Sequence, residues 1–389
     1  MLRTLLALSP FFAPASSAFG QESEPAVDRF VAFATALEES TRAWDPSFLE
    51  ENFDFDAFML TVTRDIEVED VFRRAFSEAV RDNFSFGEVV VQNLTQFDGT
   101  YVFLRMLPGE PPRALFRFAG DDGLNYHELH LRERSDGRIS IVDVFAYNTG
   151  EMLSETMRRP YVATASDQNR SLVSRLLRPE AAYVEALPRI EALIRLQQTG
   201  KPKKALAIYR SLPEEVRLQP EILALYLEIA FDVDDATYLK ALAVYSEAHP
   251  DSPALDLLMI DFHLLRGEYE QCLARIDALD RRVLMDPYLD LYRGNVLLDA
   301  GRKKEARAKY EAAIERDPRL EYEAWWFLLG LAVLEEDHAA TLELLLALES
   351  DYGVEMLDLE SVEEYAKFVA SPEYQRWLEL HLEEEPDQG

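Results

Sequence analysis

The sequence predicts an α+β domain, with helices packed on a curved antiparallel sheet, followed by an all-α solenoid of helical repeats. Two patterns support this fold class. Apolar residues recur with helical spacing before Asn83 and then alternate with period two as far as Tyr147. In the second half, small and aromatic residues recur about every 34 residues, which is typical of a helical repeat. The 389 residues suffice for two such parts.

Residues 1–20 have the pattern of a signal peptide. Arg3 precedes an apolar run, and small residues gather where a signal peptidase would cut, after Ala18 or Gly20. The run is too short to span a bilayer. We therefore expect an exported protein, periplasmic or extracellular, that is cleaved near residues 18–20 and has no membrane insertion.

The charge balance and the cysteine content exclude several classes of function. Lys and Arg total 40 against 72 Asp and Glu, which gives a formal net charge of −32 at pH 7. Such a field repels phosphate backbones, so we predict no nucleic-acid binding. The single cysteine, Cys272, excludes an internal disulfide and a cysteine-based metal site. We expect no metal and no other cofactor.

The α+β domain is assigned to residues 25–160. Stripes at helical spacing include Phe30, Phe33 and Leu37, and a second stripe begins at Asp70. After Asn83 the alternating runs end at turn signals such as Asp-Gly and Pro-Gly, which predicts four or five strands. These runs are 89–94, 101–107, 114–118, 126–131 and 139–147.

This order of elements resembles the cone-shaped fold of the nuclear transport factor two-like superfamily, where N-terminal helices pack inside a curved meander. Its members range from enzymes to ligand binders to structural modules, so the resemblance alone does not choose a function. The enzymes of that superfamily use Asp, His or Tyr side chains that project into the cone.

His127, Asp143 and Tyr147 are the candidate pocket residues of this domain. Asp143 is two residues from Ile141 and His127 is two residues from Leu129, so each polar residue shares the strand face of its apolar neighbour. One register across the hairpin brings His127 beside Asp143. Such a pair inside an apolar cone would be able to transfer protons. The alternative is structural, with Asp143 accepting hydrogen bonds from a neighbouring loop or helix.

Residues 161–180 are predicted to be a polar connecting segment, and residues 181–350 carry the repeat. Gly267 lies 34 residues before Gly301 at the same turn between two helices. Small residues let paired helices approach closely, and an aromatic residue four positions later fills the gap to the next helix. The offsets that match are Gly294, Leu297, Ala306, Tyr310, Ala313 and Pro318, with Ala205–Tyr209 and Ala241–Tyr245 as earlier copies.

These positions resemble those of tetratricopeptide-repeat proteins, with about five helical hairpins and with capping helices and an acidic tail in residues 351–389. The resemblance implies a right-handed superhelix whose concave groove binds peptides or protein surfaces. We predict groove contacts at Tyr226, Phe262, His263 and Trp325. Their surroundings are apolar or acidic, which favours a basic or apolar partner over an acidic one.

The sequence therefore favours an exported, non-enzymatic adaptor or scaffold that binds a protein partner through the repeat groove. The alternative is a small-ligand-binding or enzymatic cone, with its pocket near His127 and Asp143 and the repeats as an accessory. An open cone interior with convergent polar groups would favour the alternative. A third possibility is that the two modules form one rigid scaffold.

Overall fold

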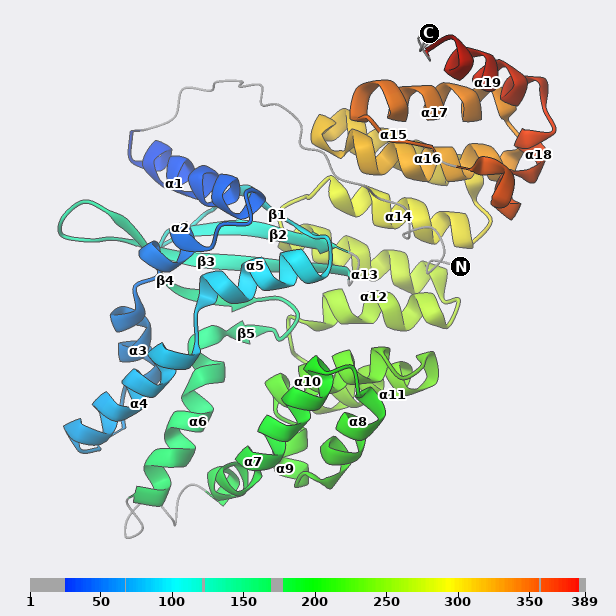
Figure 1. The fold of residues 1–389 in the computed structure, drawn as a ribbon. Helices are drawn as coiled ribbons and strands as arrows, with labels where there is room; N and C mark the ends of the chain where they lie inside the picture. Colours follow the sequence, from blue (N-terminus) through cyan, green and yellow to red (C-terminus); the bar gives the residue numbers. More distant parts are fainter. Residues whose placement is uncertain (1–24, 67, 121–122, 169–177, 357, 385–389) are drawn as a thin grey trace, which may run out of the picture. The chain divides into compact units, whose positions relative to one another are not determined.

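The computed structural model describes residues 25–66, 68–120, 123–168, 178–356 and 358–384. The described chain forms two compact units, residues 25–266 and residues 267–384. Figure 1 shows the elements of each unit in sequence colours. The predicted signal peptide, most of the second half of the predicted connecting segment and the end of the acidic tail lie outside the described residues.

Five helices precede the sheet in the described part of the chain, and the last of them corrects the sequence prediction. We expected a strand over residues 89–94, but these residues belong to a helix. Its buried stripe is Phe86, Val90 and Leu94, spaced four apart, and Ser85 caps its first turn by accepting from the backbone N–H of Glu88. The helices are α1 (Pro25–Arg42), α2 (Ser47–Asn52), α3 (Phe55–Thr63), α4 (Asp70–Asn83) and α5 (Phe86–Gln96).

The sheet is antiparallel, with its five strands in chain order from β1 to β5. The four longer strands confirm the predicted runs, and the two-residue β5 was not predicted. Residues from α1, α2 and α5 pack on one face of the sheet, the inner face, and form its core (Figure 1). The strands are β1 (Thr100–Leu107), β2 (Arg113–Gly120), β3 (Gly123–Glu133), β4 (Ile139–Ala146) and β5 (Glu151–Met152).

The helix that follows the sheet, α6 (Leu153–Gln168), runs through the predicted domain boundary at residue 160. Its Tyr161 is buried between Phe72 and Phe76 of α4, with ring centroids 5.8 and 4.9 Å away. The beginning of the predicted connecting segment is therefore packed helix rather than a surface tether. These two phenylalanines lie with α6, whereas Phe86 and Phe116 fill the sheet core.

From residue 178 onward the described residues form helices and turns without strands, which confirms the all-α second half. The first unit continues with α7 (Arg178–Gln198), α8 (Pro202–Ser211), α9 (Glu214–Arg217), α10 (Pro220–Phe231), α11 (Asp235–Ala248) and α12 (Leu255–Leu265). The second unit contains α13 (Tyr269–Arg282), α14 (Tyr288–Asp299), α15 (Lys303–Arg316), α16 (Glu321–Glu335), α17 (His338–Tyr352), α18 (Ala366–Val369) and α19 (Pro372–Glu384).

The predicted packing positions are buried in the structure. Three glycines that follow the ends of helices, Gly200, Gly267 and Gly301, adopt φ of +63°, +69° and +74°, a conformation that favours glycine. In the second unit, Tyr310 lies against Gly294 and stacks on Phe327. The small and aromatic residues of the second helices are all buried: Ala205, Tyr209, Ala241, Tyr245, Ala306 and Tyr310.

The C-terminal helices cover the last helical pair of the second unit. Phe368, Tyr374 and Trp377 are buried against Leu345 and Leu348 of α17. Across the described residues, no helix is both long and apolar enough to cross a membrane.

Candidate functional site

His127 lies on the inner face of the sheet, where both of its ring nitrogens have partners. Nδ1 is 3.0 Å from the Tyr101 hydroxyl, and Nε2 is 3.3 Å from Nδ2 of Asn125. The rings of Phe86 and Tyr101 pack around it, with centroids 6.4 and 5.6 Å away. The imidazole is thus part of a small polar cluster within the domain core.

The neighbours of Asn125 assign the tautomer of His127. Asn125 Oδ1 accepts from the backbone N–H groups of Tyr126 and Asn148, at 2.9 and 3.0 Å. Its Nδ2 therefore donates to Nε2, and Nδ1–H of the imidazole donates to Tyr101. Burial lowers the pKa of His127 to about 4, so the ring is neutral at pH 7. Both nitrogens are already used inside the protein, which disfavours a role as an open general base.

Asp143 lies on the opposite face from His127, because β4 contains a bulge. Leu131 pairs with Ile141 and His130 with Asp143, so Val142 is one extra residue on β4. The bulge reverses the alternation that the sequence suggested. Our expectation that His127 and Asp143 lie side by side was wrong: His127 pairs with Ala146, and it is His130 that pairs with Asp143.

The contacts of Asp143 are those of a structural group. Its Oδ1 accepts from the backbone N–H groups of Val144 and Ser154, at 2.9 and 3.1 Å, and its Oδ2 accepts from the Ser154 hydroxyl. Burial raises the pKa of Asp143, while these hydrogen bonds oppose the shift. The carboxylate therefore fixes the start of α6, which is the structural alternative that the sequence left open.

Tyr147 does not join His127 in a pocket either. Its ring is buried beside Tyr126, with centroids 5.7 Å apart, and its hydroxyl donates to Glu128 Oε1 at 2.8 Å. Glu128 in turn accepts from Arg113 at 2.7 Å. The three candidate pocket residues are thus divided between the two faces of the sheet, and their polar groups do not converge.

An open cleft of about 420 Å³ lies elsewhere in the first unit, between the start of β5 and the loops around α10 and α11. Its volume falls in the range of small-molecule sites. Two polar side chains that line the cleft already have partners within the protein. His249 Nε2 donates to the Leu218 carbonyl at 2.7 Å, and the Ser252 hydroxyl contacts the Tyr245 hydroxyl at 3.1 Å. The acids Glu151, Glu155 and Asp251 also line it, which gives the cleft a preference for cations.

Next to this cleft, Arg159 of α6 joins the sheet domain to helix α10. Its guanidinium contacts both carboxylate oxygens of Glu151, at 2.8 and 2.6 Å, and reaches Glu221 of α10 at 2.7 Å. Two carboxylates thus share one cation. Burial raises the pKa of Glu221 to about 7, against the pull of Arg159. The network holds α6 to α10.

The predicted groove residue Tyr226 is buried rather than exposed. Its ring stacks on Tyr209 with centroids 4.0 Å apart, so it belongs to the packing between α10 and α8. Phe262 and His263 are half-buried at the end of α12, with ring centroids 5.5 Å apart. Trp325, in the second unit, is half-buried and packs on two core clusters. Phe262, His263 and Trp325 keep some surface for a partner, and Tyr226 does not.

The structure adds an aromatic surface that the sequence interpretation missed. We call Phe231, Tyr238 and Asp261 the aromatic patch. Phe231 is 40% exposed, its ring lies 5.4 Å from that of Tyr238, and the Tyr238 hydroxyl donates to Asp261 at 2.8 Å. Glu228 and Asp235 are exposed three residues before Phe231 and Tyr238, on the same helical faces. The sequence did contain a signal for this surface, because Phe231 is an aromatic residue at the end of a helix and is followed by acidic residues.

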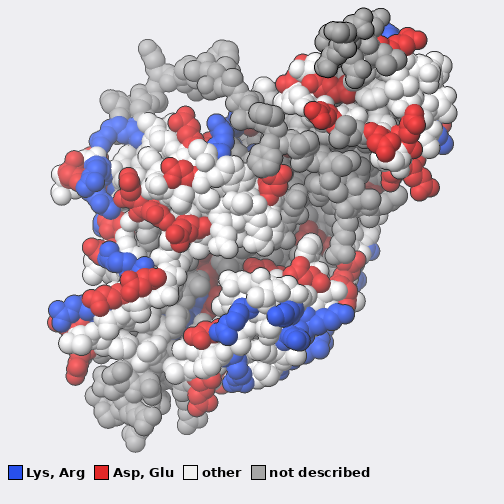
Figure 2. Space-filling view, in the orientation of Figure 1, with Lys and Arg blue, Asp and Glu red and all other residues white. Residues whose placement is uncertain are grey.

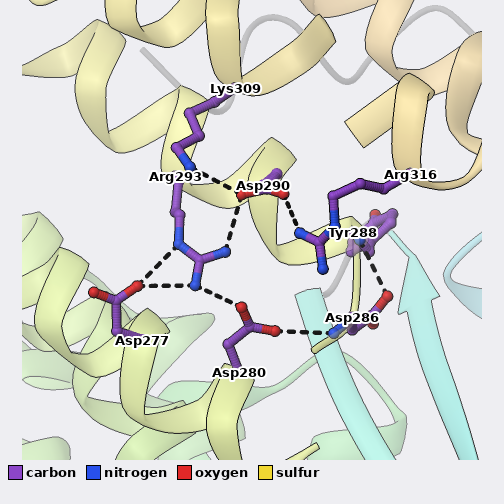
Figure 3. Close-up of polar contacts among 8 residues, drawn as sticks. All are labelled: Asp277, Asp280, Asp286, Tyr288, Asp290, Arg293, Lys309 and Arg316. Atoms are coloured by element: carbon purple, nitrogen blue, oxygen red, sulfur yellow. Dashed lines mark hydrogen bonds and ion pairs between the residues drawn. The ribbon is translucent and has the colours of Figure 1, made fainter. Parts of the chain in front are cut away.

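The second unit contains a partly buried ionic network (Figure 3). Arg293 contacts Asp277, Asp280 and Asp290 at 2.8, 2.7 and 3.1 Å. Asp290 is only 3% exposed and also accepts from residues of α15. The acids raise the pKa of Arg293 against the effect of burial. The network joins three helices and consists of Asp277, Asp280, Asp286, Tyr288, Asp290, Arg293, Lys309 and Arg316.

Opposite charges satisfy one another around the buried Asp290 and Arg293, so the network fixes helix register rather than offering open ligands. Elsewhere in the described ranges, too, no group of three or more His, Cys, Asp or Glu side chains is placed to hold a metal ion.

Comparisons with protein-family models, curated proteins and solved structures find no match to this chain.

Proposed function

We propose that this protein is a non-enzymatic adaptor or scaffold whose helical half is a tetratricopeptide-like array that binds a protein or peptide partner. It acts outside the cytoplasm after loss of its signal peptide. The partner is basic or apolar where it meets the groove of the array.

One observation carries this proposal. The same pair, a small buried residue and an aromatic residue four positions later, recurs on α8, α11 and α15. Stacked units of this kind build extended surfaces for binding other proteins. The turn glycines with positive φ between paired helices support the same interpretation.

The aromatic patch is the binding surface that the charges favour. Exposed aromatic rings carry most of the energy of a protein interface when a partner covers them. Acidic side chains around Phe231 favour a partner that presents Lys or Arg, and they steer its approach. The alternative of an enzymatic cone has less support, because His127 and Asp143 occupy opposite faces of the sheet.

Affinity capture with the full mature chain tests the proposal, using the extracellular or envelope fraction of the source cells. The variant Phe231→Ser removes the exposed ring. Leu60→Ser is the matched control, because Leu60 is 70% exposed on α3, in the sheet domain. We expect a protein retained by the wild type and by Leu60→Ser but lost by Phe231→Ser. Capture of the same proteins by all three chains, or of none by any, would refute the proposal.

A further inference from the structure

The hairpin of α7 and α8 carries a basic surface on a strongly acidic protein. Asp and Glu supply 72 of the 389 residues, yet none occurs between Glu191 and Glu214. Four cations, Arg195, Lys201, Lys203 and Lys204, are exposed around the turn between the two helices, and we call them the basic patch. Figure 2 shows Lys and Arg side chains gathered in this region, where Figure 1 draws α8 and α11.

The cations of the basic patch form no ion pairs with the residues that the structure describes. A second basic run, Arg302-Lys303-Lys304, occupies the same place after a turn glycine, and there Arg302 pairs with Glu270 and Glu305 at 2.9 and 2.6 Å. Lys303 donates to a carbonyl at 3.0 Å. The two runs therefore differ, because the second contains an ion-paired cation and the basic patch does not.

The nearby acid Asp234 is engaged in another way. It caps α11 by accepting from the Thr237 backbone at 2.7 Å, and this hydrogen bonding is the main cause that lowers the pKa of Asp234, with a smaller contribution from Lys203. The start of α8 adds to the positive field. Its N-cap, Lys201, makes no side-chain cap, and no acid lies in its first turn, where the helix dipole favours negative charge.

We infer that the basic patch is a docking surface for a short acidic peptide segment of a protein partner. This surface is distinct from the aromatic patch and has the opposite charge preference. The lysines and the positive end of the α8 dipole together suit carboxylates spaced along an extended chain.

An acidic peptide fits these observations better than a membrane or a nucleic acid does. A narrow peptide contacts the basic patch alone, within a Debye length of about 8 Å at physiological salt. A broad anionic surface also meets the surrounding acids of a chain with net charge −32, and their repulsion opposes its binding.

Fluorescence anisotropy with a labelled hexaglutamate peptide tests this inference on the full mature chain. The variant K201Q/K203Q/K204Q removes three charges from the basic patch, and R302Q/K303Q/K304Q removes three charges from the second basic run, where Arg302 is ion-paired. We expect the first variant to bind about tenfold more weakly, because each exposed charge contributes roughly a factor of two. The second should bind within about twofold of the wild type, and wild-type binding should weaken as salt rises from about 50 to about 200 mM.

An equal loss of hexaglutamate affinity in the two variants would mean that only the overall charge of the protein matters, and would overturn the inference. Undetectable binding of hexaglutamate to the wild type would overturn it as well. Vesicles of phosphatidylserine and phosphatidylcholine, and a single-stranded oligonucleotide, are tested in parallel. Tighter binding to either one that depends on Lys203 and its neighbours would replace the peptide by that ligand. Phe231→Ser should keep hexaglutamate binding, so failure of the proposed function and failure of this inference are distinguishable.

Discussion

The close approach of α14 and α15 at Gly294 allows a quantitative test of how the helical half packs. A Cβ added at Gly294 would lie 2.2 Å from Cε1 and 2.6 Å from Cδ1 of Tyr310, far inside van der Waals contact. The ring has no room to withdraw. It is fully buried, stacks on Phe327 with centroids 5.3 Å apart and donates its hydroxyl to Asn295 at 2.8 Å.

Two opposing effects set the expected magnitude for Gly294→Ala. Replacing glycine by alanine inside a helix stabilises by about 0.5–1 kcal/mol when the new methyl group has space. Overpacking a tight contact costs about 1–3 kcal/mol. We therefore expect Gly294→Ala to lower the free energy of unfolding by about 1–2 kcal/mol, measured by urea unfolding followed by circular dichroism with an unchanged denaturant slope.

A double-mutant cycle separates the clash from other causes. In a Tyr310→Ala background the ring is absent, so Gly294→Ala should stabilise by about 0.5–1 kcal/mol and the sign of its effect should reverse. If Gly294→Ala is neutral or stabilising in the wild type, or has the same effect in both backgrounds, the close packing of the two helices is refuted.

Three further substitutions test the polar groups. Asp143→Ala should destabilise by about 1–3 kcal/mol in urea unfolding, because two buried donors of Ser154 lose their acceptor. The Glu221 carboxyl ionises near 4.5 when unfolded and near 7 when folded, so wild-type stability should fall as pH rises through that window, and Glu221→Gln should flatten the fall. His127 has a folded pKa of about 4 and an unfolded one of 6.5, so wild-type stability should fall as pH drops through this interval, and His127→Gln should lose less. Thermal unfolding across pH 4–8 measures both profiles, and a variant whose profile superimposes on the wild type contradicts the assigned shift.

The sheet was predictable where its strands end at strong turn signals, and less so elsewhere. Turns at Pro108-Gly109 and Ser135-Asp136-Gly137 separate strands that the alternation of apolar residues already marks. The helix α5 was misinterpreted because Val89 and Val91 alternate like a strand, although the buried stripe of Phe86 and Val90 has helical spacing. Short apolar runs fit both periods, and packing against the sheet selects the helix.

The prediction of the candidate site was wrong because of a single extra residue. Period-two alternation assigned Asp143 to the inner face, and the extra residue Val142 in the bulge moved it to the other face. A bulge leaves no signal in one sequence, because the alternation on each side of it looks regular. The helical half was easier to predict, because its small and aromatic packing residues recur from one pair of helices to the next.

Arg159 of α6 contacts Glu151 and Glu221, and we call these contacts the junction. The junction determines which variants can locate the binding surfaces. Deleting the predicted α+β domain would remove this arginine and leave the buried Glu221 carboxyl without its charged donor, a loss of about 1.5–3 kcal/mol for a hydrogen bond to a charged group. The deletion would also take away the Thr149 carbonyl that accepts from the Tyr245 hydroxyl at 2.8 Å. Both losses fall on α10 and α11, the helices that contain Phe231 and Tyr238, and they are a large fraction of the stability of a marginally stable domain. A truncated chain that fails to bind would therefore report unfolding of these helices. Single substitutions at exposed positions such as Phe231 leave the junction intact, so only they assign binding to a surface.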